Sequence, residues 1–364
     1  MDQGHQVDVV YTDYCKAFDK VSHNILIYKL ESFGIHGDLL RWLDSYLRNR
    51  TQAVSIKGYL SSFIPISSGV PQGSHLGPLL FNIFINDINN VFVSSDYLLY
   101  ADDTKIFKSI KSLDDCHALQ SDLNRLETYC KLNSLHLNIN KCAIIFFSRK
   151  RKTLLYKYTV NNNDISRKNE VRDLGVTLDK LSFGSHIRSI STKAYRMLGF
   201  IMRTGSEFKN TSTINLLYNA YVRSILEYAS TVWNPQYNIQ INEIEKIQNN
   251  FLKYLSFKSS DSTHEPLLAH SKRRSMRDQV FLNKIINNIV DSPFLLSKLS
   301  LNCPRSNARQ PLCFYTPTCH SSHNANCFLI RACREYNKHF GNIDIFHLSL
   351  IQFKDNICNN LKLT

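Results

Sequence analysis

Residues 97–107 of this chain read Tyr97-Leu98-Leu99-Tyr100-Ala101-Asp102-Asp103-Thr104-Lys105-Ile106-Phe107. Apolar residues lead into and out of a small residue followed by two acids, a pattern that predicts a β-hairpin with Asp102 and Asp103 at its turn. Adjacent carboxylates repel each other, so holding both ionised on a rigid turn is costly unless a cation lies between them. The pair is therefore a candidate metal site, although ordinary turn chemistry is the simpler explanation of an isolated Asp-Asp.

Charge is distributed unevenly along the 364 residues. The chain holds 44 Lys and Arg against 30 Asp and Glu, a net charge of +14, and it is 43% hydrophobic. Residues 1–110 carry 9 basic and 11 acidic side chains, so the whole positive excess lies downstream of them. A basic excess of this size favours a polyanionic partner, nucleic acid rather than a membrane surface, with a merely basic soluble surface as the alternative. The length predicts two or three domains.

Cysteine usage and hydropathy bear on the compartment. The ten cysteines show no paired framework and the first residues show no signal peptide, so we expect an intracellular, nuclear or cytoplasmic location. Residues 58–86 carry no charged side chain, but Pro65, Pro71 and Pro78 break the stretch too often for a membrane span. We therefore expect no transmembrane segment.

Hydrophobic periodicity predicts an α/β architecture with a mixed sheet. The predicted strands and hairpin cover residues 7–13, 53–66, 97–107 and 137–147. The predicted helices of this part cover residues 24–33, 39–46, 76–88 and 113–132. After residue 180 the pattern becomes helical, with predicted helices at 213–229, 244–255 and 279–290.

Three further pieces give the Asp-Asp pair a chemical context. Asp13 ends the 7–13 strand, so three carboxylates from two sheet elements could lie together, as two magnesium ions in a nucleotidyl-transfer site require. Residues 68–81 form a glycine-rich loop that opens a helix, and its backbone amides and Gln72 could line a nucleotide. Lys141 precedes the last strand, where a cation could meet a leaving pyrophosphate.

Residues 13–23, 69–81, 100–103 and 140–142 resemble, in this order, the successive motifs of reverse transcriptases. The version is that of LINE-type (non-LTR) retrotransposons, and of jockey-like elements in particular. Residues 172–179, 221–228 and 232–235 agree with it, and the resemblance runs in order from about residue 7 to residue 256.

The resemblance implies an RNA-directed DNA polymerase that transfers a nucleotide from a dNTP to a primer 3′-hydroxyl. Its partners would be an RNA template and a DNA primer, or an RNA–DNA hybrid. Asp13, Asp102 and Asp103 match the triad that binds two Mg²⁺ ions, with Mn²⁺ as a possible substitute. Lys141 matches the proposed proton donor to pyrophosphate.

Three substrate-binding residues are implied in the same way. Phe18 matches the bulky residue under the sugar that disfavours a 2′-hydroxyl, and Gln72 and Gly73 match the loop that packs against the incoming nucleotide and template. Leu174-Gly175-Val176 resembles the hairpin that steadies the primer end.

The right-hand polymerase architecture of the family implies three parts. These are a palm at residues 1–180, a helical thumb-like domain at 181–260, and a C-terminal helical or irregular segment at 261–364. The family places a fingers subdomain ahead of the first catalytic aspartate, and only twelve residues precede Asp13. We therefore expect a palm and thumb that lack most of the fingers, a truncated copy with weak or no activity alone.

Other functions remain open. A catalytically silent nucleic-acid-binding remnant would share the basic charge, and a two-metal nuclease would share the carboxylates. The nuclease gives no reason for Phe18, Gln72 and Lys141. In the tail, a zinc site could be sought among Cys313, Cys319, His320, His323, Cys327 and Cys333. The close Cys and His pairs of zinc sites are absent there, so we do not expect zinc.

Overall fold

The structure is a computed structural model that describes residues 4–150, 152–179, 182–208, 210–258, 267–302, 312–319 and 321–363. The chain divides into two compact units, with the boundary in the sequence between Val171 and Arg172. The first unit has one hydrophobic core cluster and the second unit has two, and each unit is described by itself.

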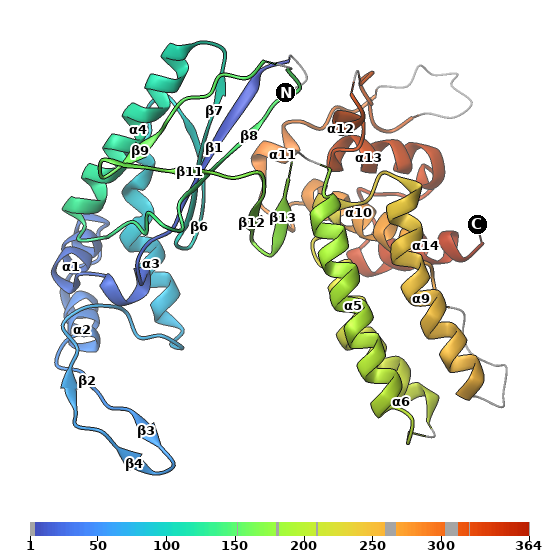
Figure 1. Ribbon diagram of the computed structural model, residues 1–364, viewed down its shortest axis with the longest axis horizontal. Helices are drawn as coiled ribbons and strands as arrows, with labels where there is room; N and C mark the ends of the chain where they lie inside the picture. The colour runs from blue at the N-terminus through green and yellow to red at the C-terminus, as the bar shows by residue number, and fades with distance from the viewer. Residues whose placement is uncertain are drawn as a thin grey trace. The chain divides into compact units, whose positions relative to one another are not determined.

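The first unit is built on a five-stranded mixed sheet with the strand order β11-β8-β1-β7-β6 (Figure 1). The β11–β8 pair is parallel and the other pairs are antiparallel, which confirms the predicted mixed sheet. The strands are β1 (Gln6–Thr12), β6 (Asp96–Tyr100), β7 (Asp103–Ile110), β8 (Ala143–Phe147) and β11 (Ser166–Arg167).

Helices cover one side of this sheet (Figure 1). They are α1 (His23–Ser32), α2 (Gly37–Leu47), α3 (Leu76–Ile85) and α4 (Leu113–Leu132), with short 3-10 turns at Ala17–Lys20 and Asn86–Asn90. Val10 on β1 pairs with Ile106 on β7 and with Ile144 on β8, and all three side chains lie in the core. This apolar row across the central strands fixes the register, because a slip by one residue would turn it to the other face.

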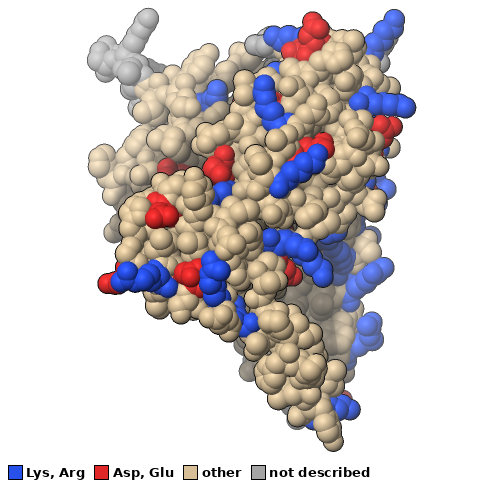
Figure 2. All heavy atoms as spheres, turned by 90° about the vertical axis from the view of Figure 1, so that its left-hand side faces the viewer, with Lys and Arg blue, Asp and Glu red and all other residues tan. Residues whose placement is uncertain are grey.

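Shorter strand pairs extend from the first unit. Strands β2 (Thr51–Gln52) and β5 (Ile64–Pro65) form the base of a long hairpin, and β3 (Ser55–Ile56) and β4 (Tyr59–Leu60) form its end around Lys57 and Gly58. Strands β9 (Thr159–Val160) and β10 (Asn163–Asp164) pair beside α4. Large apolar side chains of the long hairpin are exposed, and Figure 2, in which this hairpin is the lowest part of the view, shows few charged residues there.

The second unit is helical after its first hairpin, β12 (Val171–Asp173) with β13 (Val176–Leu178). The longest helices are α5 (Gly184–Thr204), α9 (Asn238–Lys258), α10 (His270–Ile286) and α14 (Leu350–Leu363). Shorter ones are α6 (Thr211–Leu217), α7 (Ser224–Glu227), α8 (Ser230–Trp233), α11 (Pro293–Leu296), α12 (Ser322–Ala325) and α13 (Phe328–Glu335). Two π-helical turns cover Tyr218–Arg223 and Tyr336–Phe340.

Several predicted elements have other bounds in the structure, and two of the differences have a clear cause. The predicted strand at 137–147 is confined to β8, because Asn138 and Lys141 form a turn in which the Lys141 amide donates to the Asn138 carbonyl at 3.0 Å. The predicted helix at 279–290 begins nine residues earlier, at His270, and ends at Ile286. The reason is a cap from another helix, since both Glu245 oxygens on α9 accept backbone amides at the start of α10.

A buried ion cluster joins α10 to the preceding helices. The Glu227 carboxylate is 2% exposed and lies 2.6 Å from an Arg277 guanidinium nitrogen and 3.2 Å from Nδ1 of His270. Although burial alone would raise the pKa of Glu227, its contacts with His270 and the nearby arginines lower it below the ordinary value. This cluster ties the residues of the predicted thumb and of the predicted C-terminal segment into one unit.

Candidate active site

Strand pairing brings the predicted carboxylates to one end of the sheet. Thr12, the last residue of β1, pairs with Thr104 of β7, and the Thr12 hydroxyl donates to the Thr104 carbonyl at 3.1 Å. Asp13 therefore follows β1 at the level where the β6–β7 turn presents Asp102 and Asp103. The predicted hairpin is confirmed, with Tyr100 paired to Asp103.

The turn itself is strained. Ala101 has a φ of +52°, the left-handed region that costs a side chain with a Cβ about 1–2 kcal/mol. Such strain persists only where surrounding pairs hold the backbone, and here β7 is paired on both sides, with β1 and with β6. The acids thus sit on a turn held by three strands.

Lys141 lies beside Asp13, from the other side of β1. The Asn138 amide donates to the Asp13 carbonyl at 2.7 Å, and Tyr14 bridges to Leu137, so the turn that carries Lys141 is fastened to the end of β1. The Lys141 Nζ is 3.1 Å from Oδ2 and 3.5 Å from Oδ1 of Asp13. Oδ2 of Asp13 is buried, and its contact with Lys141 is an ion pair without hydrogen-bond geometry. This oxygen therefore retains capacity to coordinate a cation.

Carboxylate oxygens are hard ligands of the kind that Mg²⁺ prefers. The backbone arrangement and the Asp13 oxygen fit such an ion. Within the described ranges, however, no group of three His, Cys, Asp or Glu side chains is arranged to hold a metal ion. This finding also covers the described part of the Cys/His tail, and His320 lies outside the described residues.

Buried groups behind the acids stay uncharged. Burial is the main reason that the pKa of Tyr14 is raised, and the charge of Asp102 adds to the effect. Burial likewise raises the pKa of the Cys142 thiol. Tyr14 and Cys142 therefore add no charge beside the acids.

Phe18 lies in the 3-10 turn that follows Asp13. Its ring stacks on Phe81 of α3 with centroids 4.4 Å apart, and its carbonyl accepts the Val70 amide at 2.9 Å. These contacts hold Phe18 between the Asp13 segment and the glycine-rich loop.

The glycine-rich loop packs tightly on the same turn. Gly69 has a φ of +91°, and a Cβ there would lie 2.8 Å from the Cα of Asp19. The Gln72 side chain already has a hydrogen-bond partner within the protein, because its amide donates to Oδ1 of Asp19 at 2.7 Å. Gly73, with a φ of +79°, has open space around it.

A polar cavity of about 660 Å³ opens between this loop, the turn after Asp13 and the base of the long hairpin. Lys16, Lys20 and Arg50 line it together with Gln72 and Asp19. In the part of the chain that the structure describes, these three cations form no salt bridge. Sequence reasoning missed them, since Arg50 lies 30 residues from Lys20 and no spacing rule connects the two.

The second unit carries the hairpin that resembles a primer-end support. Gly175, with a φ of +86°, lies over the Tyr228 ring, and a Cβ there would be 3.0 Å from Cε1 of Tyr228. The Tyr228 hydroxyl donates to the Leu174 carbonyl at 3.0 Å. Tyr228 thus holds the turn between β12 and β13 in place.

A mixed-sheet palm with one acid at a strand end and two on a neighbouring hairpin is the arrangement of a nucleotidyl-transfer polymerase. The chain belongs to the family "Reverse transcriptase (RNA-dependent DNA polymerase)", whose model matches residues 2–202.

Relatives of known name come from mobile elements. The RNA-directed DNA polymerase from mobile element jockey of Drosophila melanogaster is 30% identical over 259 residues, 68% of this chain and 28% of the relative. The corresponding jockey protein of Drosophila funebris is 29% identical over the same shares. The probable RNA-directed DNA polymerase from transposon BS of Drosophila melanogaster is 27% identical over 70% of this chain and 29% of the relative. The resemblance to jockey-like, non-LTR elements is confirmed, and the chain spans less than a third of the length of these relatives.

Solved structures with some likeness to this chain include telomerases. The apo telomerase from Candida tropicalis has a TM-score of 0.38 at 13% identity, covering 77% of this chain and 46% of that one. The telomerase from Candida albicans with a fragment of telomeric RNA has a TM-score of 0.35 at 15% identity, covering 74% and 47%. As expected from the sequence, no described helix is long and apolar enough to cross a membrane.

Proposed function

We propose that this chain is an RNA-directed DNA polymerase that adds dNTPs to a primer 3′-hydroxyl on an RNA template. The observation that carries the proposal is the placement of Asp13, Asp102 and Asp103 at one end of the paired strands β1, β7 and β6, with Lys141 against Asp13. Family membership supports the reaction type.

Asp13, Asp102 and Asp103 would hold two Mg²⁺ ions, with Mn²⁺ as a substitute. Bound ions would neutralise the triphosphate and lower the pKa of the primer hydroxyl. Lys141, now paired with Asp13, would turn to the pyrophosphate and protonate it. Phe18 would support the sugar and exclude a 2′-hydroxyl.

The polar cavity supplies a place for the triphosphate of the dNTP. Lys16, Lys20 and Arg50 line it and form no salt bridge with any described residue, so their charges are available to phosphate oxygens. Gln72 would release Asp19 and contact the nucleotide, and Gly73 would let the loop approach it closely.

The second unit supports the nucleic acid in this proposal. Residues 172–364 carry 24 Lys and Arg against 13 Asp and Glu, a net charge of +11. Arg188, Lys193, Arg196 and Arg203 are exposed on α5, and they would follow hybrid phosphates by charge rather than by sequence. The hairpin held by Tyr228 would steady the primer end.

A catalytically silent nucleic-acid-binding protein is the second candidate. Two observations favour it. No group of three metal-binding side chains is arranged to hold an ion among the described residues, and Lys141 is paired with Asp13. It predicts hybrid binding that weakens with salt and no primer extension.

Primer extension separates the two candidates. The purified chain is given Mg²⁺, dTTP and oligo(dT) on a poly(rA) template, and hybrid binding is measured in parallel at two salt concentrations. The polymerase extends the primer and loses extension, but not binding, with Asp102→Asn. Salt-sensitive binding with no extension by the unsubstituted chain would favour the silent protein.

A further inference from the structure

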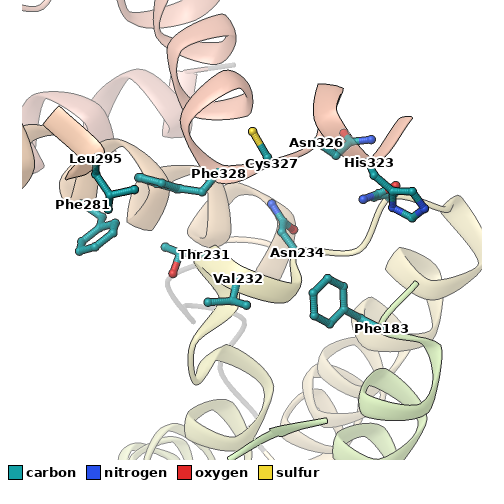
Figure 3. Close-up of a pocket in the computed structure, with 11 residues that line it drawn as sticks. Phe183, Thr231, Val232, Asn234, Phe281, Leu295, His323, Asn326, Cys327 and Phe328 are labelled. Atoms are coloured by element: carbon teal, nitrogen blue, oxygen red, sulfur yellow. The ribbon is translucent and has the colours of Figure 1, made fainter. Parts of the chain in front are cut away.

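A second pocket, of about 410 Å³, lies within the second unit and has no part in the proposed reaction (Figure 3). Its wall comes from α8, from α10, and from the segment that connects α12 to α13. Its volume suits one planar ring system of nucleobase size.

Aromatic faces form much of the wall. Figure 3 shows Phe281 and Phe328 on one side of the pocket and Phe183 on the other. The rings of Phe281 and Phe328 have centroids 5.0 Å apart and are tilted by 53°. Such faces are the surfaces on which unstacked bases are held.

Polar groups without partners share the pocket. Neither Gln236 nor His323 has a side-chain hydrogen bond to any described residue, and both are half-buried in the wall. Asn326 donates its side-chain amide to the Ser322 carbonyl, and its side-chain oxygen accepts no hydrogen bond from any described residue. Groups of this kind match the donor and acceptor edge of a base.

Buried charges hold the wall in shape. Arg274, 1% exposed, donates from Nε to Oδ1 of Asn234 at 3.0 Å, and Asn234 lines the pocket. Arg331 donates to the carbonyls of Asn326 and Thr231 and is itself held by Asp278 at 2.8 Å. The pocket is therefore formed before any ligand arrives, which lowers the cost of binding.

We propose that this pocket binds a single unstacked nucleobase from a single-stranded segment of RNA. The unit's net charge of +11 attracts the strand, the aromatic faces stack the base, and Gln236 and His323 contact its edge. An apolar protein side chain would use the aromatic wall but would leave these polar groups unpaired. The inference goes beyond the proposed function because it concerns retention of RNA and needs neither dNTP nor metal.

A pocket-filling variant tests the proposal. Val232 lines the pocket, so Val232→Trp should block it, whereas Ile239→Trp adds the same ring to an exposed position on α9 that does not line it. Binding of a fluorescent single-stranded 12-nucleotide RNA, without Mg²⁺ or dNTP, should weaken about tenfold for Val232→Trp and stay unchanged for Ile239→Trp. The same RNA made abasic at every position should bind both variants and the unsubstituted chain equally.

Cys327 gives an independent readout, because its exposed thiol lines the pocket. Intact RNA should slow maleimide labelling of Cys327, and abasic RNA should not. Equal RNA affinity of the two tryptophan variants, or equal protection by intact and abasic RNA, would overturn the proposal. If Val232→Trp melts earlier than the unsubstituted chain, Gln236→Ala takes its place and must weaken binding of intact RNA alone. Asp102→Asn should lose primer extension but should keep the RNA binding and the Cys327 protection of the unsubstituted chain. The polymerase proposal and the pocket proposal can therefore be refuted independently of each other.

Discussion

Gly69 lies where the glycine-rich loop approaches the turn after Asp13 most closely. Gly69→Ala would add a Cβ 2.8 Å from the Asp19 backbone at a φ of +91°, whereas Gly73→Ala would meet only the unfavourable φ of +79°. We expect Gly73→Ala to lower the free energy of unfolding by about 1 kcal/mol and Gly69→Ala by about 3 kcal/mol. Urea denaturation of both variants measures the difference, and equal losses would show that the close approach does not matter.

Arg50 is the residue whose role in the polar cavity is easiest to isolate. Removing one charge-assisted phosphate contact should raise the KM for dNTP about tenfold in Arg50→Ala and leave kcat unchanged. The matched control is Arg48→Ala, because Arg48 pairs with Asp44 outside the cavity. Steady-state kinetics check this, and a KM equal to that of the control would remove Arg50 from the nucleotide site.

Asp278 makes stability depend on pH. Burial raises its pKa to about 6, partly offset by Arg331. The folded chain therefore binds a proton that the unfolded chain lacks between about pH 4 and pH 6, so stability falls as pH rises through this window. Between pH 4 and pH 7, the free energy of unfolding of Asp278→Asn should therefore fall by about 2–3 kcal/mol less than that of the unsubstituted chain. Urea unfolding at pH 4 and pH 7 tests it against Asp355→Asn, an exposed acid on α14, and an unchanged slope would contradict it.

At the scale of elements, α10 depends on a cap from α9. Glu245 accepts the amides of His270 at 3.1 Å and Ser271 at 2.7 Å. Glu245→Ala should lower the free energy of unfolding by about 1–2 kcal/mol, because two amides at the helix start lose their acceptor. Glu243→Ala, on the same helix but away from α10's first amides, is the control. Equal thermal melting of the two variants would argue against the cap.

Elements whose ends are set locally could be predicted from the sequence. Helix α4 begins at its predicted residue because Ser112 and Asp115 form a capping box within the same segment. The start of α10 could not be predicted, since Glu245 is 25 residues away in sequence. The carboxylate placement followed from strand and turn patterns, but the convergence of Lys16, Lys20 and Arg50 depends on tertiary packing. The hydrogen bond between Gln72 and Asp19 could not be predicted from the sequence for the same reason.

At the scale of the whole molecule, charge and chemistry are divided between the two units. The first unit holds the carboxylates, Lys141 and the polar cavity, and residues 172–364 hold most of the excess positive charge. This division suits an enzyme in which one part performs phosphoryl transfer and another retains the nucleic acid. It also explains why binding and catalysis should be separable by single substitutions.

The most direct test of the central claim is incorporation of a single nucleotide on an RNA template by three proteins. These are the unsubstituted chain, Asp102→Asn, and Asp96→Asn, which changes an exposed acid at the far end of the same hairpin. We predict Mg²⁺-dependent incorporation that Asp96→Asn retains and that Asp102→Asn lowers by at least about 100-fold, with hybrid binding equal in all three. Incorporation by Asp102→Asn at the rate of Asp96→Asn would contradict the assignment of these carboxylates as the catalytic centre.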